Sequence, residues 1–175
     1  QRSKELSAKD IVDVYIKVYA GKFTDNATDD YMQNWVLSQG IKVGERFIDF
    51  TAPDAKGVMH TLSEEIKGKI ALIDLWASWC GPCRRESMSM KPLYESYKDK
   101  GFTIVGVARE QRREDMEAAI KKDGYPWLCL LELNDAGKIW EKYGVVNGGG
   151  AIFMVDREGK ILAIKPSAEE VKAIL

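Results

Sequence analysis

The distribution of apolar and polar residues predicts an alternation of strands and helices over most of the chain. Unbroken apolar runs rich in branched and aromatic residues are typical of buried strands. Such runs occur at Ile70–Trp76, 102–108, 127–132, 151–156 and 160–165. Helical patterns lie between them, at 80–98 with a kink expected near Pro92, at 112–123, at 136–143, and after a capping box formed by Ser167 and Glu170. This order predicts an α/β sandwich with a mixed central sheet.

The first part of the chain has a different pattern. Apolar residues at helical spacing predict helices at 8–20 and 29–38. Within 43–62 we expect two short strands around a turn at 54–57, followed by one helical turn at 63–68 with Ser63 as its N-cap. We therefore divide the chain into a helical N-terminal extension, residues 1–42, and one α/β domain, residues 43–175. The chain begins at Gln1 rather than at methionine, which is compatible with removal of a signal peptide, an anchor or an upstream domain.

Composition and charge bound the choice of partners. The 26 basic and 27 acidic residues leave a formal charge of −1, so electrostatics give no reason to expect nucleic acid or an anionic membrane as a partner. No apolar run approaches the roughly 18 residues that a membrane-spanning helix needs. The length of 175 residues suffices for one domain with a hydrophobic core.

Two of the three cysteines, Cys80 and Cys83, lie where the apolar run ending at Trp76 meets a helical pattern. The N-terminus of a helix presents unpaired N–H groups and a partial positive charge, which favour a thiolate over a thiol. Pro82 falls in the first helical turn, where a missing N–H costs nothing. This arrangement predicts a dithiol redox site. Cys80, at the exposed end of the helix, is the expected nucleophile, and Cys83, one turn further in, is the expected resolving thiol.

The segment Trp76-Ala-Ser-Trp-Cys-Gly-Pro-Cys83 resembles the active-site signature of thioredoxins. With Arg84-Arg85-Glu86 behind it, the pattern is similar to the TlpA/ResA branch of thioredoxin-like proteins, over roughly residues 43 to 175. The resemblance implies a thioredoxin-like fold with an N-terminal β-hairpin. It also implies a bacterial protein of cell redox homeostasis, exported to the periplasm or cell envelope. Gly81-Pro82 matches the thioredoxin dipeptide, which predicts a reducing potential of about −270 mV.

The same resemblance implies the reaction and its partners. Members of this branch are thiol–disulfide oxidoreductases, so we expect reduction of disulfides in protein substrates. An upstream thiol is expected to supply the electrons. The redox-active Cys80–Cys83 disulfide is then the reactive group, and no other cofactor is expected.

Two carboxylates are candidates for proton transfer in such a reaction. Asp74 is an acid in an otherwise apolar strand, six residues before Cys80, where the thioredoxin pattern places its buried aspartate. Burial raises the pKa of such a group, which lets it move a proton at neutral pH. Glu86, three residues past Cys83, matches a glutamate of the ResA pattern. The plainer alternatives are a hydrogen-bonded core acid for Asp74 and a solvated helix residue for Glu86.

Substrate contacts are expected from residues around the sulfurs and from the loop before the 151–156 strand: Trp79, Gly81, Pro82, Gly149 and Gly150. Thioredoxin-like proteins usually carry a cis-proline where this chain has Gly150, and that proline pairs with the substrate backbone. A non-proline cis peptide costs roughly 2.5–4 kcal/mol, so we expect a trans bond here. The glycines at 148–150 also predict a looser loop and weaker gripping of a substrate by strand addition.

Three other functions are compatible with parts of the pattern. A zinc site would need Cys129 and His60 beside the CxxC pair, but these two lack ligand spacing, so no metal is expected. A peroxiredoxin-like peroxidase would need threonine or serine three residues before its reactive cysteine, where this chain has Ala77. The third alternative is a binding module that kept the fold while Gly150 impaired the active site. Cys129 itself lies in an apolar run and is expected to be a buried small hydrophobe.

Overall fold

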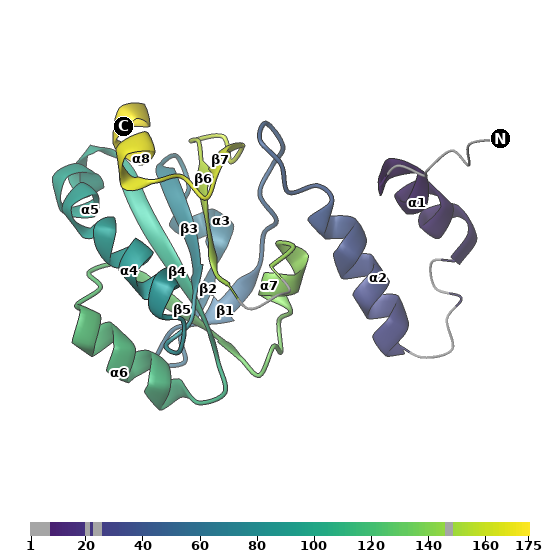
Figure 1. Ribbon diagram of the computed structural model, residues 1–175, viewed down its shortest axis with the longest axis horizontal. Coiled ribbons are helices and arrows are strands. Elements are labelled where there is room, and N and C mark those ends of the chain that lie inside the picture. The colour runs from purple at the N-terminus through teal and green to yellow at the C-terminus, as the bar shows by residue number, and fades with distance from the viewer. Residues whose placement is uncertain (1–7, 20–21, 23–25, 146–148) are drawn as a thin grey trace.

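The computed structural model describes residues 8–19, 22, 26–145 and 149–175 (Figure 1). Its strands are β1 (Thr51–Pro53), β2 (Met59–Thr61), β3 (Ile70–Trp76), β4 (Phe102–Glu110), β5 (Leu128–Leu133), β6 (Ala151–Val155) and β7 (Ile161–Ile164). Its α-helices are α1 (Ala8–Val14), α2 (Asn26–Ser38), α3 (Leu62–Glu65), α4 (Gly81–Ser89), α5 (Lys91–Tyr97), α6 (Arg113–Asp123), α7 (Ile139–Lys142) and α8 (Ala168–Ile174). A π-helical segment, Tyr15–Tyr19, follows α1, and a 3-10 turn, Lys98–Lys100, follows α5.

Five of the strands form one mixed sheet in the order β5-β4-β3-β6-β7. The central strand, β3, pairs in parallel with β4 and antiparallel with β6. Six of its seven residues are buried, which agrees with its unbroken apolar run because a strand covered on both faces needs no polar side. The predicted α/β sandwich with a mixed central sheet is confirmed.

Helices cover both faces of this sheet (Figure 1). The crossovers from β3 to β4 and from β4 to β5 step in the same direction along the sheet. Parallel crossovers are right-handed, so α4, α5 and α6 lie on one face, together with α8. α3 and α7 lie on the opposite face. The carboxyl end of β3 therefore emerges between two layers of helix, where α4 begins.

The helix predicted at 80–98 is two helices rather than one bent helix. α4 ends at Ser89, and α5 begins at Lys91 with Pro92 in its first turn. Proline has no N–H and its ring clashes with the preceding turn, which explains a full break beside the predicted kink. Met90, between the two helices, is 1% exposed and anchors the break in the core.

The β1–β2 hairpin forms around the predicted turn, but the helix after it is capped differently from the prediction. Thr61, not Ser63, is the N-cap of α3, and its side chain makes no capping hydrogen bond. The Ser63 N–H instead donates to the Asp49 carboxylate at 2.9 Å. The local pattern could not reveal this cap because its acceptor comes from a distant part of the chain.

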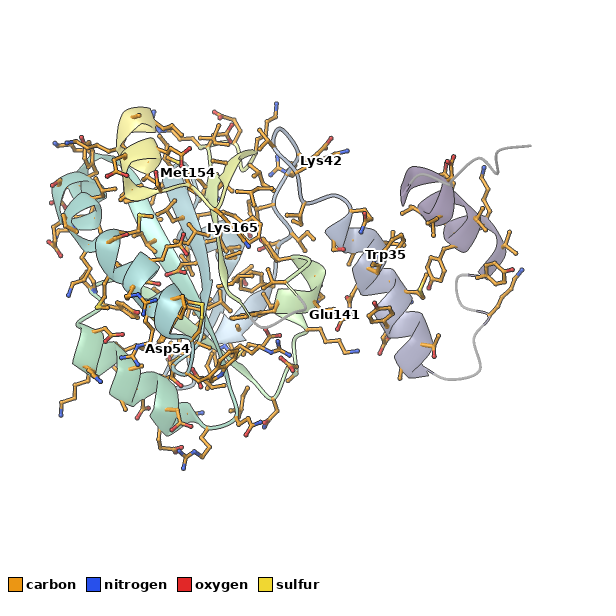
Figure 2. All side chains as sticks on the ribbon, in the orientation of Figure 1. Trp35, Lys42, Asp54, Glu141, Met154 and Lys165 are labelled. Atoms are coloured by element: carbon orange, nitrogen blue, oxygen red, sulfur yellow. A yellow bond between two sulfur atoms is a disulfide. The ribbon has the colours of Figure 1, made fainter. Side chains whose placement is uncertain are left out.

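The N-terminal helices lie on the α7 side of the domain (Figure 1). The helix predicted at 8–20 changes from α to π geometry at Tyr15, and its predicted end lies outside the described residues. α2 packs beside α7: Asn34 donates to Glu141 at 3.5 Å, and Trp35 and Glu141 line a cavity of about 630 Å³ (Figure 2).

The division of the chain at residue 42 stays a prediction. Among the described helices, none combines the length and apolar character needed to cross a membrane.

Candidate active site

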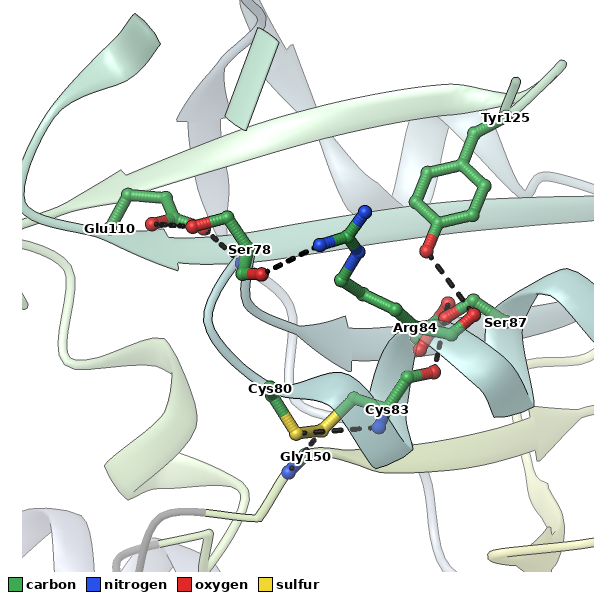
Figure 3. Close-up of a disulfide and its surroundings, with 9 residues drawn as sticks. Ser78, Cys80, Cys83, Arg84, Ser87, Glu110, Tyr125 and Gly150 are labelled. Carbon is green, nitrogen blue, oxygen red and sulfur yellow. Dashed lines mark hydrogen bonds between the residues drawn. A yellow bond between two sulfur atoms is a disulfide. The ribbon is translucent and has the colours of Figure 1, made fainter. Parts of the chain in front are cut away.

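The CxxC segment joins the end of β3 to α4 (Figure 3). Cys80 is the N-cap of α4 and Pro82 lies in its first turn, as predicted. Cys80 and Cys83 form a disulfide. Its sulfurs therefore lie at the N-terminus of the helix, where backbone N–H groups and the helix dipole favour a thiolate once the bond is reduced.

Backbone N–H groups donate to both sulfurs. The Cys83 N–H donates to Cys80 Sγ at 3.3 Å, and the Gly150 N–H donates to Cys83 Sγ at 3.1 Å. Residue exposure does not separate the two cysteines, since Cys80 is 6% and Cys83 8% exposed. The expected contrast between an open Cys80 and a shielded Cys83 is therefore not seen in the disulfide form. The assignment of nucleophile and resolving thiol stays a prediction.

Asp74 lies behind this site in the middle of β3. It is 3% exposed, and its Oδ2 accepts a hydrogen bond from Ser87 Oγ of α4 at 2.6 Å. Burial raises the pKa of Asp74 to about 7, the Ser87 hydrogen bond opposes the rise, and the charge of Glu86 adds to it. The predicted burial of Asp74 and its raised pKa are confirmed, whereas its part in proton transfer stays a prediction.

The remaining predicted residues surround the disulfide. Glu86 is partly buried on α4 and acts on Asp74 through its charge. Gly81 and Pro82 are exposed, and Trp79 is 58% exposed. The Trp79 ring lies 6.4 Å from that of Trp140 on α7, a neighbour that the sequence pattern did not identify. The roles of Trp79, Gly81 and Pro82 in binding a substrate stay predictions.

Gly150 faces the disulfide from the start of β6 (Figure 3). No cis peptide bond occurs among the described residues, so the predicted trans bond before Gly150 is confirmed. A Cβ atom at residue 150 would lie 2.0 Å from the Leu75 carbonyl oxygen and 2.9 Å from Cys83 Sγ. A Cβ atom at Gly149 would meet nothing within 4 Å. Glycine is thus required at residue 150 because its backbone lies close to that of Leu75. Its N–H donates to the Cys83 sulfur, and a proline, which has no N–H, could not make this bond.

Two sets of polar contacts stabilise the turn before Cys80, and sequence reasoning missed both. The buried Glu110 carboxylate, at the end of β4, accepts both the N–H and the O–H of Ser78. The Arg84 guanidinium pairs with Asp123 through two bonds of 2.6 Å and donates to the Ser78 carbonyl at 3.1 Å. The available signal was weak: Glu110 is an acid just beyond an apolar run.

Glu110→Ala is expected to lower the free energy of unfolding by about 1–3 kcal/mol, because it leaves the Ser78 N–H without its acceptor. Chemical denaturation of the oxidised protein measures the change. Glu117→Ala removes an exposed carboxylate from α6 and is the matched control, with an expected change within about 0.5 kcal/mol. Equal unfolding midpoints for the two variants would show that Glu110 does not anchor the turn.

The zinc alternative does not fit the arrangement of the described residues, in which no three histidine, cysteine or acidic side chains are grouped as metal ligands. His60 pairs instead with Glu65, its Nδ1 lying 2.7 Å from Oε1. Cys129 is free and buried in β5, as predicted. Burial raises the pKa of its thiol well above the ordinary range, which keeps the group protonated and unreactive.

The site is a disulfide at a helix N-terminus, with a buried carboxyl group behind it whose pKa is close to neutral pH. This arrangement is that of a thioredoxin-fold thiol–disulfide oxidoreductase. The AhpC/TSA family model matches residues 43–164. A thiol-disulfide oxidoreductase ResA from Geobacillus kaustophilus is 29% identical over 134 residues, which is 77% of this chain and 75% of the relative. The thioredoxin domain of a thiol-disulfide oxidoreductase from Bacteroides vulgatus is 35% identical, with a TM-score of 0.68, covering 76% of this chain and 94% of that one.

A solution structure of a thiol:disulfide interchange protein from Bacteroides sp. is 34% identical, with a TM-score of 0.69, covering 77% of this chain and 88% of that one. The chain belongs to the AhpC/TSA family. Its resemblance to the TlpA/ResA branch and its thioredoxin-like fold are confirmed by these relatives. The protein is therefore an enzyme, a thiol–disulfide oxidoreductase.

Proposed function

We propose that this oxidoreductase works as a reductant of disulfides in protein substrates, using Cys80 and Cys83 as its dithiol. The observation that supports this role is the Cys80–Cys83 disulfide at the start of α4, backed by the buried Asp74. A helix N-terminus favours a thiolate, and a carboxyl group that titrates near neutral pH can take up a thiol proton.

The first step is attack by the Cys80 thiolate on one sulfur of the substrate disulfide. An S–S bond forms between Cys80 and the substrate, the substrate disulfide breaks, and its other sulfur leaves as a thiolate that takes a proton from water. Cys80 is proposed as the attacking group because it is the N-cap residue of α4, where the positive end of the helix dipole favours its thiolate.

The second step releases the substrate. The Asp74 carboxylate accepts the proton of the Cys83 thiol, and the Cys83 thiolate attacks Cys80 Sγ. The bond between Cys80 and the substrate breaks, and the second substrate sulfur leaves as a thiolate that is protonated from water. Two electrons have then passed from the enzyme dithiol to the substrate. Burial is the main cause that brings the pKa of Asp74 to about 7, and the negative charge of Glu86 adds to the rise.

Substrate polypeptides are proposed to lie across the surface formed by Trp79, Gly81 and Pro82 and to contact the backbone of Gly149 and Gly150. An upstream thiol reductant would return the disulfide to the dithiol, and no cofactor besides the redox-active disulfide is needed for this cycle. Location in the periplasm or cell envelope is part of the proposal, supported by the resemblance to the TlpA/ResA branch.

Reduction of insulin by the protein, with dithiothreitol as the electron source, tests the proposed function. Turnover above the reagent background is expected, with no consumption of hydrogen peroxide. If insulin is not reduced although Cys80 and Cys83 cycle reversibly in graded redox buffers, the protein is a binding module instead. Rapid peroxide turnover would support the peroxidase alternative.

Cys83→Ser is expected to accumulate a mixed disulfide between Cys80 and insulin, because the resolving thiol is missing. Non-reducing electrophoresis with mass spectrometry measures the adduct. Cys80→Ser should form none, and Cys129→Ala, which changes a buried cysteine outside the site, should turn over like the parent protein. An adduct carried by Cys83 in the Cys80→Ser variant would reverse the assigned roles.

A further inference from the structure

Ser87 is a serine at a fully buried position of α4, with 0% of its surface exposed. Its hydroxyl lies between two acceptors: Asp74 Oδ2 at 2.6 Å and the Cys83 carbonyl oxygen at 3.0 Å. Ser87 thus links Asp74 on β3 to the backbone of the second cysteine; Figure 3 shows Ser87 one turn beyond Cys83 on α4. A buried hydroxyl needs such partners, but one acceptor would have sufficed.

A hydroxyl group carries one proton and can donate to only one of these acceptors at a time. When Asp74 is ionised, the shorter contact identifies the carboxylate as the recipient. When Asp74 is protonated, its own O–H can donate to Ser87 Oγ, and the Ser87 proton is free to turn to the Cys83 carbonyl. The Ser87 hydroxyl and the Asp74 carboxyl group are then hydrogen-bonded to each other in both protonation states of Asp74, so that neither state leaves one of these two buried groups without a partner.

The other groups that face Asp74 do not supply this. Glu86, on the same helix, is negative and disfavours the carboxylate. Tyr125, before β5, and Cys129, on β5, both have a pKa raised by burial, so they stay protonated and uncharged at neutral pH. Cys83 is the group whose proton is to be accepted. In the described part of the chain, the hydrogen bond donated to the Asp74 carboxylate comes from Ser87.

We propose that Ser87 is a positioning residue whose hydroxyl reverses its hydrogen bond with the protonation state of Asp74 and so keeps Asp74 available to accept the Cys83 proton at neutral pH. The inference rests on the proposed function of Asp74. It adds a residue that acts through Asp74 and does not touch the substrate.

The direct test is a carbon-13 NMR titration of the Asp74 carboxyl group in the oxidised protein. Ser87→Ala removes a hydrogen bond to the charged form, and we expect the titration midpoint to rise by about one pH unit. Ser89→Ala is the matched control, because Ser89 also bonds a backbone carbonyl of α4, that of Glu86 at 2.6 Å, but is exposed and does not contact Asp74. Ser87→Thr keeps the hydroxyl and is expected to restore the parent midpoint.

The second readout is the release of thionitrobenzoate when the reduced protein is in excess over dithiobis-nitrobenzoate. Attack by Cys80 on the reagent releases the first equivalent, and attack by Cys83 on the sulfur of Cys80 releases the second. In Ser87→Ala, the pH profile of the second release should move upward with the NMR midpoint, so that the rate at pH 7 falls several-fold. The first release should be unchanged. In an Asp74→Asn background, adding Ser87→Ala should produce no further shift.

The outcomes separate this inference from the proposed function. If Asp74→Asn changes the second release but Ser87→Ala leaves both the midpoint and the profile in place, Ser87 is only a packing residue and the inference is wrong. If Asp74→Asn itself leaves the second release unchanged, the proposed role of Asp74 fails and the inference fails with it. A rate loss without a shift along the pH axis also contradicts the inference, because that is the result of a merely structural defect.

Discussion

Asp74→Asn is expected to stabilise the oxidised protein by about 4 kcal/mol at pH 8 and to have almost no effect at pH 4. Burial raises the pKa of Asp74 from its ordinary value of 3.8 to about 7 in the folded protein. Each pKa unit is worth about 1.36 kcal/mol, which gives the size of the effect. The asparagine can still accept the Ser87 hydrogen bond, so the substitution removes the titration and keeps the contact.

The sign follows from which state binds the proton more tightly. Because the pKa is raised in the folded state, the contribution of Asp74 to stability is fully present below about pH 4 and is lost as the pH rises to about 7. Asparagine does not titrate, so the difference between variant and parent grows through this window and is constant above it. Urea denaturation at a series of pH values measures it, with Glu117→Gln, an exposed acid-to-amide change, as the control.

The same substitution is expected to slow release of the substrate from the mixed disulfide by about 10²-fold at pH 8, because the proton acceptor for Cys83 is removed. Greater stability with lower activity would mean that the buried acid is kept for function at a cost in stability. A variant that is neither more stable at pH 8 nor slower would show that Asp74 is ionised without penalty, contrary to its burial.

The sheet and its crossovers could be predicted from sequence because their signals are local. Each strand of the sheet is an apolar run whose pattern depends only on its own residues, as in Ile70–Trp76. The predictions fail where the apolar pattern does not decide the outcome. The N–H of Ser63 in α3 donates to Asp49, which lies 14 residues earlier in the chain. Pro92 can either kink a helix or break it, and the pattern did not show that a full break with a buried Met90 would form. The π-helical turn from Tyr15 has no signature in the apolar spacing.

The candidate site divides in the same way. Cys80, Cys83 and Asp74 could be identified because their types and spacing within one strand-turn-helix unit carry the chemistry. Ser87 could not, although it is close in sequence, because its importance arises only when α4 packs on β3 and brings its hydroxyl to Asp74. Glu110 lies on the neighbouring strand, 32 residues from the serine that it binds. Such pairings depend on packing between elements, which a pattern of residue types does not specify.

Gly150→Ala is expected to lower the free energy of unfolding by about 3 kcal/mol and to impair the reaction of Cys83. The added Cβ would lie 2.0 Å from the Leu75 carbonyl oxygen and 2.9 Å from Cys83 Sγ. The first of these neighbours belongs to the backbone of the central strand and cannot move aside alone, so the start of β6 must shift, at the cost typical of overpacking. The shift would also weaken the Gly150 N–H bond to the Cys83 sulfur.

Gly149→Ala is the matched control, because a Cβ there meets nothing within 4 Å and the residue is not in a left-handed conformation. It should be neutral or slightly stabilising, since alanine restricts the unfolded chain. Urea denaturation measures the stability of both variants, and the second release of thionitrobenzoate, which needs no polypeptide substrate, measures the reaction of Cys83. If the two behave alike, the close approach at residue 150 is not required. If Gly150→Ala alone fails, glycine at this position is selected by contact with β3 and the Cys83 sulfur, and the departure from proline is part of the active site rather than damage to it.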